Sequence, residues 1–89
     1  METISITVTG KVQGVFYRQS TKEKALELGI TGIVKNLPDG SVQIMASGTN
    51  DQLNQLVAWC NQGPPRAQVA SVQVEKILPH AFTGFTVQR

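Results

Sequence analysis

The strongest constraint on the fold is a change of hydrophobic period near the start of the chain. Residues 3–9 alternate between apolar and polar side chains, which is the two-residue period of a half-buried strand. Residues 17–28 place apolar side chains at helical spacing instead, and Gly29 follows as a typical C-terminal helix glycine. The chain therefore begins as a strand, a short glycine-containing loop and a helix.

The loop at residues 10–18 has the composition of an anion-binding turn. Gly10 and Gly14 bracket it, and Arg18 stands where the helix begins. The first N–H groups of a helix have no partner inside it, and the helix dipole adds partial positive charge there. Such a loop favours phosphate, and a guanidinium supplies donors that match phosphate oxygens. Taken alone, a glycine-bracketed turn is more often a structural turn that binds no ligand.

The middle of the chain predicts a hairpin. Residues 30–37 indicate a second strand, which we expect Gly32 to interrupt early. Residues 37–40 (Leu-Pro-Asp-Gly) are typical of a tight turn, because proline presets one dihedral angle and Asp-Gly takes the demanding positions. Residues 41–47 alternate again, so they pair with the second strand.

A second helix follows the hairpin. Thr49 and, three residues later, Gln52 form the pattern of a capping box. Apolar residues then recur at helical spacing as far as Cys60, and residues 63–65 (Gly-Pro-Pro) end the helix. We expect Trp59 to cover the edge of this helix and Cys60 to be a small buried hydrophobe.

The remainder predicts two strands and a loop. Residues 67–77 form the fourth strand, and Val69 is out of phase with Val72, which predicts a bulge near Ala70. A loop at residues 79–83 then leads to a short final strand containing Phe85.

The order of elements is strand, helix, strand, strand, helix, strand and a short fifth strand. This order predicts an α+β fold, the ferredoxin-like split β-α-β sandwich (βαββαβ), with a mostly antiparallel sheet and two helices on one face. A length of 89 residues is that of one small domain, which we expect to span residues 1–89.

Composition narrows the class of protein. The net charge is +2, from eight scattered basic and six acidic residues, which is thin support for nucleic-acid binding. One cysteine excludes an internal disulfide, and the first residues carry no basic flank or long apolar run. We therefore expect a cytoplasmic monomer with no nucleic-acid partner and no membrane association.

The sequence lacks the combinations of catalytic residues that most reaction classes require. His80 and Cys60 form no metal-ligand pattern, and no two carboxylates are paired in sequence. Ser20 and Thr21 lie near the loop, and a Ser–His dyad with His80 stays open as a minor alternative. Phosphoryl transfer suits this inventory, because it needs positioning and charge stabilisation more than covalent help. A carboxylate leaving group, as in an acyl phosphate, departs without a proton.

Asn36 is the candidate to hold an attacking water. It ends the second strand, and in a split β-α-β sheet the first strand neighbours the hairpin, which would bring Asn36 near the loop. Its amide offers a donor and an acceptor, enough to orient a water without taking its proton for good. Taken alone, Asn36 is more often a turn residue.

Three segments resemble the acylphosphatase family. Residues 10–18 (GKVQGVFYR) resemble its first signature, and residues 32–42 (GIVKNLPDGSV), followed by Gly48, resemble the second at matching spacing. Residues 63–69 (GPPRAQV) resemble a third common segment, so the match covers nearly the whole chain. Ile33 departs from the family, which usually has an aromatic residue there, and we expect that side chain to affect packing rather than chemistry.

The resemblance implies hydrolysis of acyl phosphates, such as acetyl phosphate and 1,3-bisphosphoglycerate, to carboxylate and inorganic phosphate without a metal or cofactor. Carried over by position, Arg18 binds the phosphate and Asn36 orients the water. The backbone amides that would complete the phosphate cradle are those of Gln13, Gly14, Val15, Phe16, Tyr17 and Arg18.

Two other functions remain at this stage. A non-catalytic regulatory domain would keep the anion loop without turnover, and fold alone does not separate it from the enzyme. An RNA-binding module would need exposed aromatic residues on the central strands, where the sequence has Ser, Thr and Gln. We expect Phe16 and Tyr17 to pack in the core or the loop rather than contact substrate, and His80 to lie in a surface loop.

Overall fold

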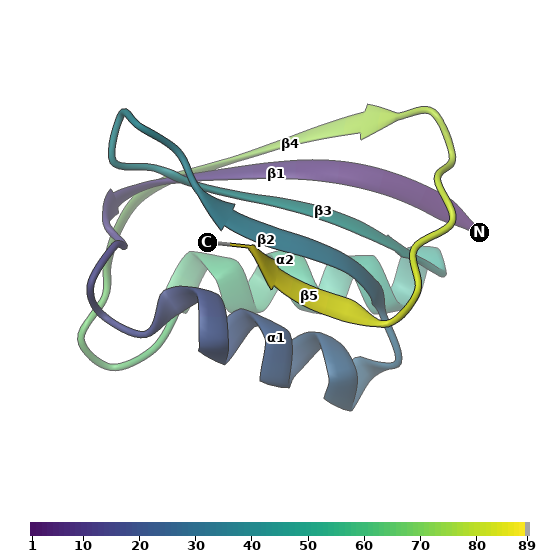
Figure 1. The fold of residues 1–89 in the computed structure, drawn as a ribbon, viewed down its shortest axis with the longest axis horizontal. Coiled ribbons are helices and arrows are strands. Elements are labelled where there is room, and N and C mark those ends of the chain that lie inside the picture. Colours follow the sequence, from purple (N-terminus) through teal and green to yellow (C-terminus); the bar gives the residue numbers. More distant parts are fainter. Residues whose placement is uncertain (89) are drawn as a thin grey trace.

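The computed structural model describes residues 1–88 and confirms the predicted order of elements. Within residues 1–88 there are five strands and two helices, and Figure 1 shows both helices beneath one face of the sheet. The elements are β1 (Glu2–Lys11), α1 (Tyr17–Leu28), β2 (Thr31–Asn36), β3 (Val42–Gly48), α2 (Asn50–Gln62), β4 (Gln68–Ile77) and β5 (Phe85–Gln88).

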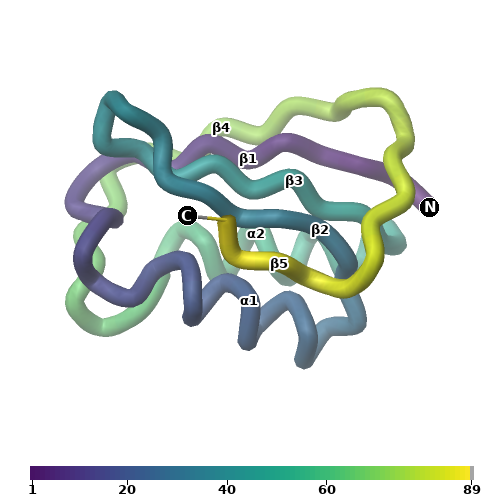
Figure 2. The backbone as a smooth tube through the Cα atoms, viewed as in Figure 1, coloured from purple at the N-terminus to yellow at the C-terminus, as the bar shows by residue number. Residues whose placement is uncertain are grey.

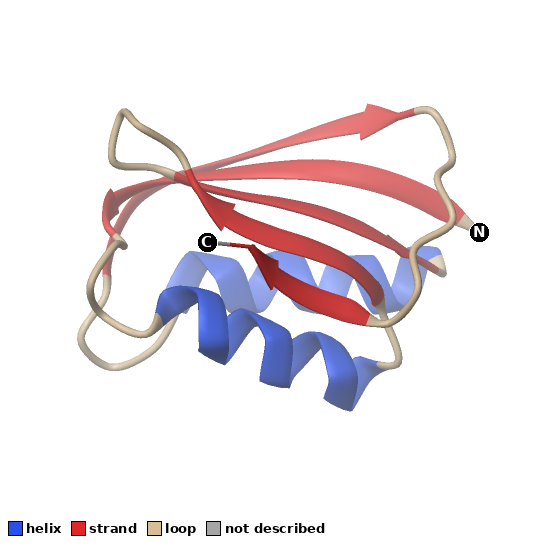
Figure 3. Cartoon of the chain, in the orientation of Figure 1, coloured by secondary structure: helices blue, strands red, loops and turns tan. Residues whose placement is uncertain are grey.

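The sheet has the strand order β4-β1-β3-β2-β5. Every neighbouring pair is antiparallel except β2 and β5, which run parallel. The two helices lie side by side against the same face, and within residues 1–88 the other face carries no helix (Figure 3). The α+β, ferredoxin-like fold class predicted from the sequence is therefore confirmed.

The core lies between the sheet and the helices, as the alternation in the strands predicts. Ile6, Val8 and Ile44 of the two central strands are fully buried. Leu56 and Cys60 of α2 are buried against them, which confirms the expectation for the cysteine. Each such aliphatic side chain contributes roughly 1.5–3 kcal/mol when it is fully removed from water.

The predicted bulge in the fourth strand is confirmed. Thr9 pairs with Ser71 and Gly10 with Val69, so Ala70 is the extra residue opposite β1. The backbones approach so closely here that a Cβ on Gly10 would lie 2.2 Å from the carbonyl oxygen of Gln68. Only glycine fits at the end of β1, where the chain turns toward α1.

Local signals also set the helix ends. Gly29 has φ 78° and its N–H donates to two carbonyls of α1, which ends that helix at the predicted residue. Thr49 and Gln52 form both bonds of the predicted capping box at the start of α2. One expectation is wrong: Gly32 does not interrupt β2, because it pairs with Ala46 on one side and Phe85 on the other.

Three segments distant in sequence meet at one end of the sheet. Figure 2 shows the loop after β1, the turn between β2 and β3, and the end of β5 at the same side of the molecule. The side chain of Gln13 joins the first two of these, since its Nε2 donates to the carbonyls of Leu37 and Ser41, both at 2.9 Å.

Among the described residues, no helix is long and apolar enough to cross a membrane.

Candidate functional site

The loop between β1 and α1 presents a row of unpaired backbone donors. Gly14 (φ 75°) and Phe16 (φ 63°, ψ 24°) both have positive φ angles. Backbone turns of this kind form concave anion sites from successive N–H groups. Within residues 1–88, the N–H groups from Gly14 to Gln19 donate to no protein acceptor, and Ser20 is the first to bond back, to Phe16. The start of α1 also has no side-chain cap. The arrangement suits an anion.

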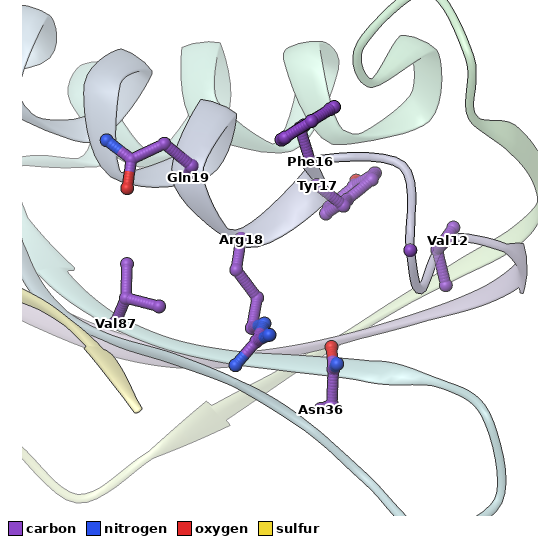
Figure 4. Close-up of a pocket in the computed structure, with 8 residues that line it drawn as sticks. Val12, Phe16, Tyr17, Arg18, Gln19, Asn36 and Val87 are labelled. Carbon is purple, nitrogen blue, oxygen red and sulfur yellow. The ribbon is translucent and has the colours of Figure 1, made fainter. Parts of the chain in front are cut away.

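Arg18 adds the positive charge to this row. It lies in the first turn of α1, is half-buried, and its Nη1 donates to the backbone carbonyl of Gln88 at 2.8 Å. The guanidinium borders a pocket of about 610 Å³, and Figure 4 shows it extending from the helix toward the sheet. The pocket is lined by Val12, Gly14, Phe16, Tyr17, Arg18, Gln19, Asn36 and Val87.

Asn36 reaches the same pocket from the end of β2. It pairs with Val42 of β3, and this register carries its side chain to the wall opposite the start of α1 (Figure 4). Its Oδ1 is buried and has no hydrogen-bond partner within the described part of the chain. Buried polar atoms are nearly always paired, so this acceptor is one that a bound group in the pocket would satisfy.

Four of the six residues whose backbone amides are predicted to form the cradle also contribute to the pocket wall. Gly14, Phe16, Tyr17 and Arg18 line it, whereas Gln13 and Val15 do not. Val15 is buried beneath the loop, and the side chain of Gln13 is bonded to the turn after Asn36. The sequence offered no signal for this role of Gln13, because it depends on where the β2–β3 turn lies.

Tyr17 anchors the loop to the core, as expected. Its hydroxyl donates to the carbonyl oxygen of Cys60 at 2.7 Å, near the end of α2, and its ring lies 5.4 Å from that of Trp59. Burial raises the pKa of the Tyr17 hydroxyl, and it raises the pKa of the Cys60 thiol to about 12. Both groups therefore stay protonated near neutral pH.

Phe16 contradicts the prediction that it packs in the core or the loop. Its side chain is 71% exposed, at the edge of the pocket. The reason is its left-handed backbone conformation, which turns the side chain outward just before the helix starts. Trp59, by contrast, is half-buried on the edge of α2, as predicted.

The Ser–His alternative is not supported by the geometry. His80 lies exposed in the loop between β4 and β5, with its ring 4.4 Å from that of Phe82, and it does not line the pocket. Thr21 is buried and its hydroxyl donates to the backbone of Tyr17. No group of three or more His, Cys, Asp or Glu side chains gathers anywhere in residues 1–88.

A family model described as acylphosphatase matches residues 4–87. The chain belongs to the acylphosphatase family. An acylphosphatase of Methylococcus capsulatus is 47% identical over 100% of this chain and 98% of its own length. The expected family and its enzyme class are thereby confirmed.

Solved structures agree with this assignment. An acylphosphatase from Coxiella burnetii superposes with a TM-score of 0.95 and 45% identity, covering 98% of this chain and 92% of the other. The acylphosphatase from Bacillus subtilis gives a TM-score of 0.96 at 30% identity over the whole of both chains. This acylphosphatase fold thus persists across a wide range of sequence.

Ile33, which departs from the family's second signature, is not among the residues that line the pocket. It is half-buried in the middle of β2, where it pairs with Met45 of β3 and Thr86 of β5. Its environment in this acylphosphatase is therefore one of cross-strand packing.

Proposed function

We propose that the chain hydrolyses the carboxyl–phosphate bond of acyl phosphates to a carboxylate and inorganic phosphate. One observation carries the proposal: Arg18 from α1 and Asn36 from β2 line one pocket beside a row of free backbone N–H groups. Family membership supports the reaction class. The chemistry of this pocket and the resemblance of its two signatures to those of the family support the roles of Arg18 and Asn36.

The phosphoryl group binds to the loop. The N–H groups of Gly14 to Gln19 donate to its oxygens, and the partial positive charge at the start of α1 adds to the attraction. The guanidinium of Arg18 donates through the N–H groups that its bond to Gln88 leaves free. These donors also stabilise the charge on the equatorial oxygens in the transition state, which is the main requirement for phosphoryl transfer.

Asn36 orients the nucleophile. Its unpaired Oδ1 accepts a hydrogen bond from a water, whose oxygen is then directed at phosphorus. The water oxygen forms a bond to phosphorus as the bond from phosphorus to the acyl oxygen breaks. The electron pair of that bond leaves with the carboxylate, and a proton of the water passes to a phosphate oxygen. Asn36 itself gains and loses no proton.

The leaving group explains why so few residues suffice. A carboxylic acid has a pKa of roughly 4, so its anion departs without a general acid. None of the residues that line the pocket is a carboxylate or a histidine.

The proposal involves no metal and no cofactor. It also takes residues 1–89 as one domain that acts in the cytoplasm as a monomer, without a nucleic-acid partner.

The test is an assay of the purified chain with benzoyl phosphate, in which the loss of the acyl phosphate and the release of inorganic phosphate are measured together. We expect equal amounts of benzoate and phosphate, competitive inhibition by inorganic phosphate, and the same rate with and without EDTA. Saturable phosphate binding without turnover would instead support the non-catalytic regulatory domain. Inhibition by EDTA would contradict the metal-free reaction.

A further inference from the structure

Phe16 is the one residue other than glycine with a positive φ in residues 1–88. A left-handed conformation is sterically unfavourable for a large side chain, and it usually falls to glycine or asparagine. The backbone bend at this position serves the row of N–H groups, and glycine would produce the same bend without that cost. The shape of the loop therefore does not account for a phenylalanine here.

Packing does not account for it either. The side chain is 71% exposed and lies outside the core cluster, so folding buries little of its apolar surface. The neighbouring Tyr17, by comparison, is fully buried and bonded. A large apolar ring held in an unfavourable conformation and left in water points to a contact with something other than the chain itself.

The position of the ring indicates what that contact is. In the transfer of a phosphoryl group, the attacking and leaving oxygens lie roughly in line on opposite sides of phosphorus. Asn36 would hold the water on the sheet side of the pocket, so the acyl group departs on the other side. Phe16 lines the pocket at the start of α1, and Figure 4 shows its ring on the side of that turn away from Asn36.

We propose that Phe16 contacts the acyl portion of the substrate and selects acyl phosphates with apolar, especially aromatic, acyl groups over small ones. The inference rests on the proposed function and adds a substrate class to it. Of the pocket's apolar residues, Val12 is buried and Val87 half-buried, which leaves the ring of Phe16 as the large apolar surface free to meet a ligand. Arg18 is the only charged side chain in the lining, and it is directed to the phosphoryl group.

The test compares kcat/KM for benzoyl phosphate and for acetyl phosphate, since their ratio cancels any effect on the phosphate cradle common to both. The variants are Phe16→Gly, which suits the backbone, and Phe16→Leu, which keeps an apolar side chain. We expect the ratio to fall about tenfold in Phe16→Gly, through KM, as expected for losing a partly buried ring, and to fall less in Phe16→Leu. Leu26→Ala, on an exposed position of α1 outside the pocket, is the matched control and should leave the ratio unchanged.

Three outcomes overturn the inference. An unchanged ratio in Phe16→Gly, with both substrates still hydrolysed, removes Phe16 from acyl recognition and leaves the proposed function intact. A fall in kcat/KM of the same size for both substrates, with weaker inhibition by inorganic phosphate, makes Phe16 part of the cradle only. If the wild-type chain hydrolyses neither substrate, the proposed function fails and this inference fails with it.

Discussion

The guanidinium of Arg18 donates a 2.8 Å hydrogen bond through Nη1 to the backbone carbonyl of Gln88. This bond ties the first turn of α1 to the end of β5, the last strand of the sheet. A guanidinium has five N–H donors in one plane. One bond to a carbonyl can therefore set the direction of the plane while the remaining donors face the pocket.

We expect Arg18→Lys to fail as a replacement. An ammonium is a point charge without a planar fork, so it does not hold the Gln88 carbonyl and two phosphate oxygens at once. We expect kcat/KM for an acyl phosphate to fall about a hundredfold or more, and further in Arg18→Ala, with the fold intact by circular dichroism. Arg66→Lys, at an exposed position outside the pocket, is the control. Wild-type kinetics in Arg18→Lys would remove bidentate binding from the mechanism.

Asn36→Ala should separate chemistry from binding. The variant loses the acceptor that orients the water, so kcat falls by about two orders of magnitude or more, of the size seen when a positioning contact is lost. The inhibition constant of inorganic phosphate stays near that of the wild type. Because the unpaired buried Oδ1 is removed, the free energy of unfolding should not decrease. A higher KM with an unchanged kcat would show that Asn36 binds substrate instead.

Gln13→Ala tests whether catalysis requires the loop and the turn after Asn36 to be fixed in position relative to each other. The variant removes both bonds of the Gln13 amide, to Leu37 and Ser41. We expect kcat to fall about tenfold, because small displacements of positioned groups are costly. Gln73→Ala, at an exposed position of β4, should have wild-type kinetics. Equal kinetics in the two variants would limit Gln13 to a structural role.

Tyr17→Phe should destabilise the fold in a pH-dependent way. The change leaves the Cys60 carbonyl without its donor and should lower the free energy of unfolding by about 1–3 kcal/mol, measured by urea denaturation. Burial raises the pKa of Tyr17 above its ordinary value of 10.0, so the hydroxyl ionises more easily in the unfolded chain. The contribution of Tyr17 to stability is therefore fully present below pH 10 and is lost as pH rises above it, in addition to an alkaline loss from the buried Cys60 thiol, which both proteins share. Above pH 10, the free energy of unfolding should fall less steeply with pH in Tyr17→Phe than in the wild type. An equal fall in both proteins would contradict a raised pKa for Tyr17.

Features set by neighbouring residues were predictable from the sequence. Three local signals each indicated a structure that the fold contains: the change of hydrophobic period near Gly10, the capping box at Thr49 and the phase shift beside Ala70. The meeting of Arg18 and Asn36 was also predictable, because it follows from the order of the strands.

Features that depend on tertiary position were not predictable. The bonds of Gln13 require a turn that lies distant in sequence, and the exposure of Phe16 requires the left-handed conformation that the loop adopts. Gly32 was expected to break a strand on propensity alone, but neighbours on both sides hold it in the ladder.

The central claim is that the loop from Gly14 to Gln19, with Arg18, holds a phosphoryl group. The most direct test is a titration of the ¹⁵N-labelled protein with inorganic phosphate, followed by NMR. We predict saturable shifts of the backbone amides of residues 14–19 and of the Arg18 Nε–H signal, with one common dissociation constant. Saturation that leaves these signals in place, or that moves amides elsewhere in the chain, would contradict the account.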